Sequence, residues 1–142
     1  MADVVETARL THDGALKILH AAIDKAVEMG VPQCIAVVDA GGHLLAFARM
    51  DDAKTLSIDS SIAKAATAAS GRIPTGGIGG EVAPLLASAT RGKLTNLPGG
   101  LPVIVEAECI GAIGVGSGKG PEDLEVAHTG LAALPGAISF GP

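Results

Sequence analysis

The stretch LPGGLPVIVEAECIGAIGVGSG, from Leu97 to Gly118, decides the fold that we expect of this chain. It holds two apolar runs rich in β-branched residues, Pro102 to Glu106 and Cys109 to Val115, with Ala107 and Glu108 between them. Two such runs joined by two residues are typical of a β-hairpin. Neither run alternates cleanly between polar and apolar residues, so we expect this hairpin to be covered on both faces or to lie in a subunit contact.

The segments before this hairpin predict a helix, a first hairpin and a second helix. Apolar residues recur at helical spacing from Thr11, the expected cap, to about Met29, and Gly30 should end that helix. The runs Gln33 to Asp39 and His43 to Arg49 surround a glycine turn and predict two paired strands. A second helix, capped by Asp52 or Thr55 and ending near Ser70, has a thin apolar face: Ile58, Ile62, Ala65, Ala66 and Ala69.

Two further helices are expected around the central hairpin. A short one should begin near Pro84, within Glu81 to Arg91, and a last one should begin with Pro121, Glu122 and Asp123. The buried stripe expected on the last helix is Leu124, Ala127, His128, Leu131 and Leu134. Helices alternating with hairpins predict an α+β fold, a single domain over 1–142 with one antiparallel sheet flanked by helices.

Composition narrows the classes of function. The formal net charge of −5 and the absence of Trp and Tyr argue against nucleic-acid binding. The acidic, polar start of the chain is unlike a signal peptide, and no apolar run approaches the ~20 residues of a membrane span. Cys34 and Cys109 lie in apolar strand runs, which favours reduced thiols over a disulfide or a metal pair. These features predict a soluble cytoplasmic protein without a metal site.

The glycine-rich segment Ile73 to Gly80 is the least ordered by composition and could act as a lid. Its glycines have neither the spacing of the dinucleotide fingerprint nor that of the P-loop, which also requires Lys-Ser/Thr after the last glycine.

Several segments together resemble one protein family. They are VVDAGGHLLAFARMDDA (37–53), SIAKAATA (61–68), PGGLPV (98–103) and IGAIGVGSG (110–118), followed by residues 123–127. In this order they resemble the haem-degradation-associated HbpS and GlcG group, which includes the C-terminal domain of PduO-type proteins. The resemblance covers about residues 10–134. It implies a profilin-like α/β/α domain that assembles through its helices into homo-oligomers, either dimers or larger rings.

The resemblance implies several functions: haem-binding sensors, proteins that bind small organic acids, and accessory proteins of catabolic pathways. This chain lacks tyrosines and has few aromatic residues, which commonly stack on a porphyrin or ligate its iron. His43, His128 and Met50 remain as candidate axial ligands of a haem.

The expected ligand site is the turn at Gly99 and Gly100, whose successive backbone N–H groups can form an anion-binding concavity. Pro98 and Pro102 would stiffen this loop. Lys64 and Arg49 are the candidate cations, because segments that resemble the family contain both. A small carboxylate would suit such a site. Alternatively, the turn only sets the strand register, and the Lys64 ammonium lies in water above the alanines of its helix.

Three functions remain open from the sequence. The first is a binding module for a small organic acid or haem. The second is a catabolic enzyme (an isomerase, lyase or hydratase) in which Asp39 or Glu106 is the base and Lys64 stabilises an oxyanion. The third is a structural assembly factor.

Overall fold

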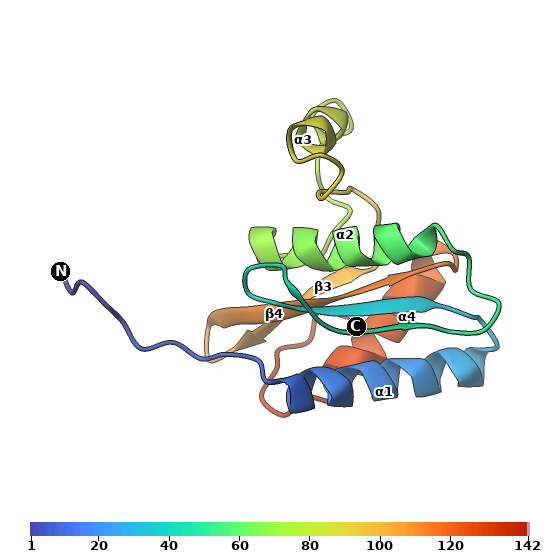
Figure 1. Ribbon diagram of the computed structural model, residues 1–142, viewed down its shortest axis with the longest axis horizontal. Coiled ribbons are helices and arrows are strands. Elements are labelled where there is room, and N and C mark those ends of the chain that lie inside the picture. Colours follow the sequence, from blue (N-terminus) through green and yellow to red (C-terminus); the bar gives the residue numbers. More distant parts are fainter. Residues whose placement is uncertain (142) are drawn as a thin grey trace.

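The computed structural model of the chain describes residues 1–141 (Figure 1). Its centre is a four-stranded antiparallel sheet in the order β2-β1-β4-β3. The strands are β1 (Cys34–Asp39), β2 (Leu44–Arg49), β3 (Gly100–Val105) and β4 (Glu108–Gly116). The helices are α1 (His12–Met29), α2 (Ser57–Gly71), α3 (Ala83–Ala89) and α4 (Gly120–Ala132). The predicted α+β fold with two hairpins is confirmed.

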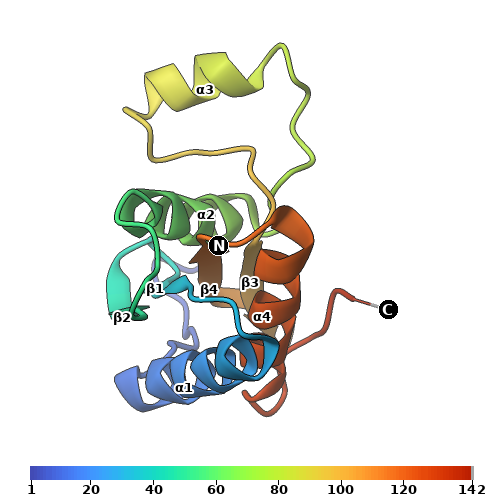
Figure 2. The same ribbon diagram turned by 90° about the vertical axis from the view of Figure 1, so that its right-hand side faces the viewer.

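The helices form two layers around the sheet. Figure 2 shows α2 on one face, with α1 and α4 together on the other. Every helix among residues 1–141 is too short or too polar to cross a lipid bilayer.

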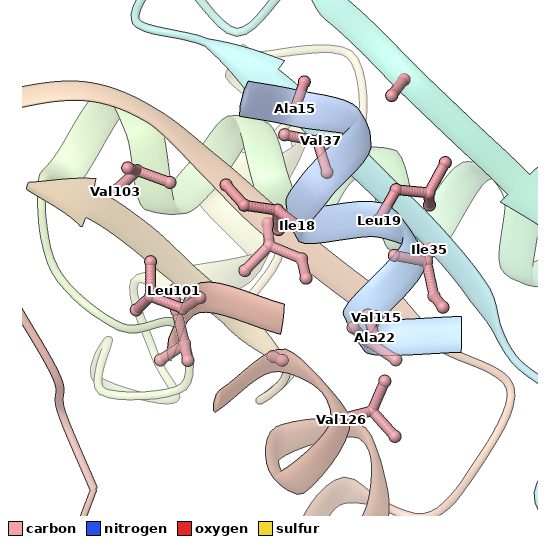
Figure 3. Close-up of a cluster of buried hydrophobic side chains, with 14 of the residues drawn as sticks. Ala15, Ile18, Leu19, Ala22, Ile35, Val37, Leu101, Val103, Val115 and Val126 are labelled. Carbon is pink, nitrogen blue, oxygen red and sulfur yellow. The ribbon is translucent and has the colours of Figure 1, made fainter. Parts of the chain in front are cut away.

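The main core lies between the sheet and the α1–α4 layer. Figure 3 shows Ile18 and Val126 from the two helices packed with Leu101, Val103 and Val115 from the strands. Each fully buried aliphatic side chain of this kind contributes about 1.5–3 kcal/mol. The expected start and end of α1 are confirmed: the Thr11 hydroxyl accepts a hydrogen bond from Gly14 N–H, and Gly30 has φ +70°.

The second core lies under α2 and is built of small residues. A Cβ atom on Gly114 of β4 would collide with the backbone of α2 at Ser61 O and Ala65 N, so glycine allows the helix to lie directly on the sheet. Because α2 lies so close to the strands, only small side chains fit on most of its buried face. The buried residues are Ser57, Ser61, Ala63, Lys64, Ala65, Ala68 and Ala69.

Several finer predictions were wrong. Of the predicted face of α2, Ala65 and Ala69 are buried, whereas Ile58, Ile62 and Ala66 are only half-buried. The reason is that the contact between α2 and β4 at Gly114, which we call the seam beneath α2, admits only small residues. Neither Asp52 nor Thr55 caps α2, whose N-cap is Leu56 without a side-chain hydrogen bond. Of the stripe predicted for the last helix, Ala127 and Leu131 are buried, as are Val126 and Gly130, whereas Leu124 and His128 are half-buried. Leu134 is also half-buried and lies beyond the end of α4. The β3–β4 turn is formed by Glu106 and Ala107, both at positive φ, so Glu108 belongs to β4.

Residues 72–97 form an arm that leaves the body after α2 and returns to β3. Its helix α3 begins beside Pro84, as predicted, and contains no buried residue. In both views α3 stands away from the rest of the chain, beyond α2 (Figures 1 and 2). We call residues 72–97 the α3 arm.

Candidate functional site

Lys64 extends from the middle of α2 into the protein, not into solvent. The residue is 4% exposed, and its Nζ donates hydrogen bonds to Val115 O at 2.7 Å and to Asp123 Oδ2 at 3.0 Å. Asp123, in the first turn of α4, is 3% exposed. The ion pair therefore joins helices that cover opposite faces of the sheet, past the end of β4.

The Asp123 carboxylate has further partners. Its Oδ1 accepts a hydrogen bond from Gly118 N–H at 2.9 Å, and that N–H also lies 3.1 Å from Gln33 Oε1. Gln33 is fully buried, and its Nε2 has no hydrogen-bond partner among residues 1–141. An unpartnered amide at this depth is unusual, because burying a donor without a partner costs about 1–3 kcal/mol.

The glycines of the predicted turn allow Lys64 to reach this position. Gly99 has φ +120°, and a Cβ atom there would lie 2.7 Å from Val115 O and 3.2 Å from Lys64 Nζ. A Cβ atom on Gly100 would collide with the α2 backbone at Lys64 O. The N–H of Gly100 already donates to the Thr75 hydroxyl at 3.0 Å, so it is not free to bind an anion. The turn thus provides close packing for the lysine and the helix.

A pocket of about 270 Å³ opens above the ion pair; we call it the Lys64 pocket. It is lined by Lys54, Ser57, Ser60, Lys64, Leu97, Pro98, Ser117, Gly118, Gly120 and Asp123. Ser57 and Ser60 belong to the first turn of α2, and Gly120 and Asp123 belong to the first turn of α4. Two helix N-termini, each with a partial positive charge, therefore border the same pocket.

Lys54 supplies the pocket with a second ammonium. It is exposed, and it takes part in no ion pair among residues 1–141. Its backbone is fixed, because its N–H donates to the Ser117 hydroxyl at 2.9 Å and its carbonyl accepts from Ser57 N–H at 3.0 Å.

Of the six ligand-binding residues predicted from the sequence, Lys64 and Pro98 line this pocket. Gly99 and Gly100 support it from below, whereas Pro102 is buried within β3. Arg49 is exposed at the end of β2, outside the lining. It lies opposite Cys34, where burial raises the pKa of the thiol and the arginine charge lowers it by a smaller amount.

The two predicted bases lie at the other end of the sheet. Asp39 pairs with Gly111 on β4, four positions from Val115, which places it about 13 Å along the strand from the Lys64 site. Asp39 Oδ1 accepts hydrogen bonds from Gly41 N–H and His43 N–H, both at 2.9 Å, so it stabilises the β1–β2 turn. Glu106 is exposed in the β3–β4 turn. The structure brings neither carboxylate to Lys64.

A larger hollow, of about 940 Å³, separates α2 from the α3 arm, and we call it the α2–α3 hollow. Its lining includes His43, the apolar side chains of Ile62 and Leu94, and the cations Arg91 and Lys93. His43 Nδ1 lies 3.3 Å from Asp39 Oδ1. The other two candidate haem ligands are elsewhere: His128 lies on α4, and Met50 packs against the main core.

Sequence reasoning missed most of the pocket lining, namely Lys54, Ser57, Ser60, Ser117, Gly118 and Asp123. From the sequence, Asp123 is predicted only to begin the last helix, where its charge suits the helix dipole. The signal that could have identified it is its position in the segment resembling the family, together with a lysine among alanines that needs a buried counter-ion. The serines carry no periodic pattern and could not be identified in this way.

The sequence of this chain is similar to one described protein family and to several known proteins. Residues 10–132 match the family described as "Haem degrading protein HbpS-like". Protein GlcG of Escherichia coli (strain K12) is 42% identical over 107 residues, which cover 75% of this chain and 80% of that protein. The 15.0 kDa protein in the dhaT-dhaS intergenic region of Citrobacter freundii is 41% identical over 132 residues, 89% of this chain and 92% of that protein.

The fold has close counterparts among solved structures. A crystal structure of a PduOC:haem complex superposes with a TM-score of 0.85 at 27% identity, over 94% of this chain and 100% of that chain. The resemblance inferred from the sequence segments is confirmed. From its sequence and its fold, this chain belongs to the HbpS-like family.

Proposed function

We propose that this protein binds a small organic acid in the Lys64 pocket. The observation that carries the proposal is a buried lysine at the floor of a small pocket, with the exposed Lys54, which has no ion-pair partner within residues 1–141, in the same lining. Helix N-termini and serine hydroxyls add donors for oxygen atoms. The pocket volume of about 270 Å³ suits an acid of a few carbon atoms better than a drug-sized ligand.

The cost of the Lys64–Asp123 pair supports a functional role. Removing two charges from water is expensive, and replacing a buried pair by apolar residues of similar size is often neutral or stabilising. A protein that needed only stability at this position would gain little from the pair. A ligand that uses the ammonium gives a reason to keep it.

Pyruvate titrated into ¹⁵N-labelled protein tests the proposal. We expect saturable chemical-shift changes at the amides of Ser57, Ser117 and Gly118, which border the pocket. Lys54→Gln should weaken binding by up to about fivefold, the upper value for one exposed charge pair. Lys93→Gln is the matched control, because Lys93 is an exposed lysine that lines the other hollow. Shifts that do not saturate, or equal losses in both variants, would contradict the proposal.

A second candidate ligand is haem, in the α2–α3 hollow. It is favoured by the similar protein solved as a PduOC:haem complex. The residues of the hollow fit such a group: Ile62 and Leu94 offer an apolar wall, and Arg91 and Lys93 could pair with propionates. Asp39 beside His43 Nδ1 leaves Nε2 to ligate iron, the usual arrangement of a ligating histidine. Bound haem would supply an iron centre at this surface.

Haem binding is tested by adding haemin and recording the shift and sharpening of its Soret band relative to free haemin. We expect His43→Ala to abolish this change, whereas His20→Ala, at an exposed histidine of α1, should leave it as in wild type. The same shift in His43→Ala would rule out this site. A spectrum identical to that of free haemin with the wild-type protein would rule out the haem candidate.

We further propose that the chain forms a homo-oligomer and that the α3 arm takes part in the contact. The support is exposed apolar area on the arm, where Ile73 is 60% and Leu85 is 69% exposed. Light scattering coupled to gel filtration should give a mass above one chain, reduced by Leu85→Glu. A monomer at high concentration would refute this proposal.

We also propose that the protein works in the cytoplasm, as an accessory of a catabolic pathway. Two free thiols, Cys34 and Cys109, are typical of a reducing compartment and support the location. We do not propose an enzyme, because Asp39 and Lys64 lie at opposite ends of the sheet.

A further inference from the structure

We propose that the ligand of the Lys64 pocket is a short acid carrying a neutral oxygen next to its carboxylate, that is, a 2-oxo or 2-hydroxy acid. This inference rests on the function proposed above and specifies which end of the ligand meets which lysine. The neutral oxygen lies deep, at Lys64, and the carboxylate lies near the surface, at Lys54.

The hydrogen bonds of Lys64 provide the first step. An ammonium group has three N–H donors. Within residues 1–141 the Nζ of Lys64 uses two of them, for Val115 O and for Asp123 Oδ2. The third is available to an oxygen atom of an occupant, because Lys64 lines the pocket.

The charges of the pocket floor provide the second step. Lys64 and Asp123 together carry no net charge, and both are at least nine-tenths buried. A carboxylate placed beside them would meet the Asp123 carboxylate as well as the ammonium, and like charges repel strongly where water is excluded. A carbonyl or hydroxyl oxygen can accept from the third N–H without this penalty.

Lys54 is the residue that can pair with the carboxylate of the ligand, because its ammonium belongs to the same pocket. It is exposed, and no acidic residue within the described chain pairs with it. The N-terminus of α2, at Ser57, follows Lys54 closely in the chain and favours negative charge at the same side of the pocket. Between the two ends, Leu97 and Pro98 form an apolar wall for the carbon atoms of the ligand.

Isothermal titration with four three-carbon acids tests the inference: propionate, (S)-lactate, pyruvate and malonate. Propionate lacks the second oxygen-bearing group, and malonate replaces it with a second carboxylate. A hydrogen bond to a charged donor is worth roughly 1.5–3 kcal/mol, so we expect pyruvate and lactate to bind at least about tenfold more tightly than propionate. Malonate should bind more weakly than pyruvate.

Two variants check the orientation. The double variant Lys64→Met, Asp123→Leu removes both charges at similar volume and should bring pyruvate down to the affinity of propionate. Lys54→Gln should weaken all four acids by a similar factor, because all four carry a carboxylate there.

The outcomes separate this inference from the function on which it rests. Propionate binding as tightly as pyruvate would overturn the inference and leave acid binding in place. Malonate binding most tightly would also overturn it, because the deep end would then take an anion. No binding of any of the four acids would remove the inference together with the proposed function.

Discussion

The seam beneath α2 and the α3 arm reverse the usual distribution of residue types. The seam buries a lysine, Lys64, at 4% exposure, whereas the arm exposes Leu85 at 69%. Charged residues are almost never fully buried unless they are paired, and large apolar patches are rarely left exposed on a monomer. The comparison teaches that the two exceptions call for different explanations: we propose a small ligand for the buried lysine and a protein partner for the exposed leucine.

Glycine also has two functions in these regions. In the seam a Cβ atom on Gly114 would collide with helix backbone, whereas around Gly79 in the arm nothing lies within 4 Å. The seam glycine is therefore required by packing. The arm glycine only enlarges the number of conformations that the unfolded chain can adopt.

The largest expected effect breaks the seam at its ion pair. Lys64→Met leaves Asp123 buried without its cation, which should lower the free energy of unfolding by about 3–5 kcal/mol. The double variant Lys64→Met, Asp123→Leu should return to within about 1 kcal/mol of wild type. Urea denaturation followed by circular dichroism measures both. A single variant as stable as the double would show that the pair is not buried as described.

A smaller loss is expected from the seam glycine. Gly114→Ala places a methyl group against the α2 backbone at Ser61 and Ala65, which cannot move without shifting the helix. We expect a loss of about 3 kcal/mol, at the upper end for overpacking. Gly79→Ala is the control and should stabilise the protein by about 0.5 kcal/mol. Thermal denaturation measures the melting temperatures of both variants. Equal changes in Gly114→Ala and Gly79→Ala would contradict the different roles assigned to the two glycines.

A third prediction concerns the base of the α3 arm. The Asn96 side chain accepts from Ile78 N–H at 2.8 Å and donates to Ile78 O at 2.7 Å, so it holds the two sides of the arm together. Asn96→Ala should cost about 1 kcal/mol or less and should speed limited proteolysis within residues 76–80. Cleavage at the β3–β4 turn is the internal reference and should not change.

The smallest effect concerns pH and the N-terminal segment. The hydrogen bond from Ala8 N–H, and next that from the Thr7 hydroxyl, lower the pKa of Glu108 below its ordinary value. A carboxyl group with a lowered folded-state pKa stabilises the contact above its unfolded-state pKa, and the contribution is lost as pH falls through the folded-state pKa. The NMR chemical shift of the Ala8 amide should therefore change only at a pH below the ordinary pKa range of glutamate. In Glu108→Gln this pH dependence should be absent.

The order of elements could be predicted from the sequence because each is defined by local residues. Thr11 and Gly30 mark the ends of α1, and glycine turns separate β-branched runs. The buried face of α2 could be predicted only in part. Ala65 and Ala69 are buried as expected, but hydrophobicity also favours Ile58 and Ile62, whereas the glycine-rich strands select small residues. That selection depends on which strand lies under the helix.

The candidate site was predictable only in part, for a similar reason. Lys64 and Pro98 were identified, since a lysine among alanines and a proline–glycine turn are visible locally. Asp123 was not, because its contact with Lys64 spans 59 positions and passes the end of a strand. The sequence also does not predict that the Gly100 N–H donates to the Thr75 hydroxyl. Thr75 lies near the start of the α3 arm, 25 positions before Gly100.

The reach of Lys64 past the end of β4 has a mechanical consequence. The helix above the sheet and the helix below it are tied at one carboxylate, which also receives the backbone of Gly118. An occupant that draws the ammonium toward itself would weaken this ion pair, and the position of α4, whose first turn lines the pocket, would change with occupancy. Binding in the pocket would then change the position of α4, on the face of the sheet opposite α2, without any change in the strand register.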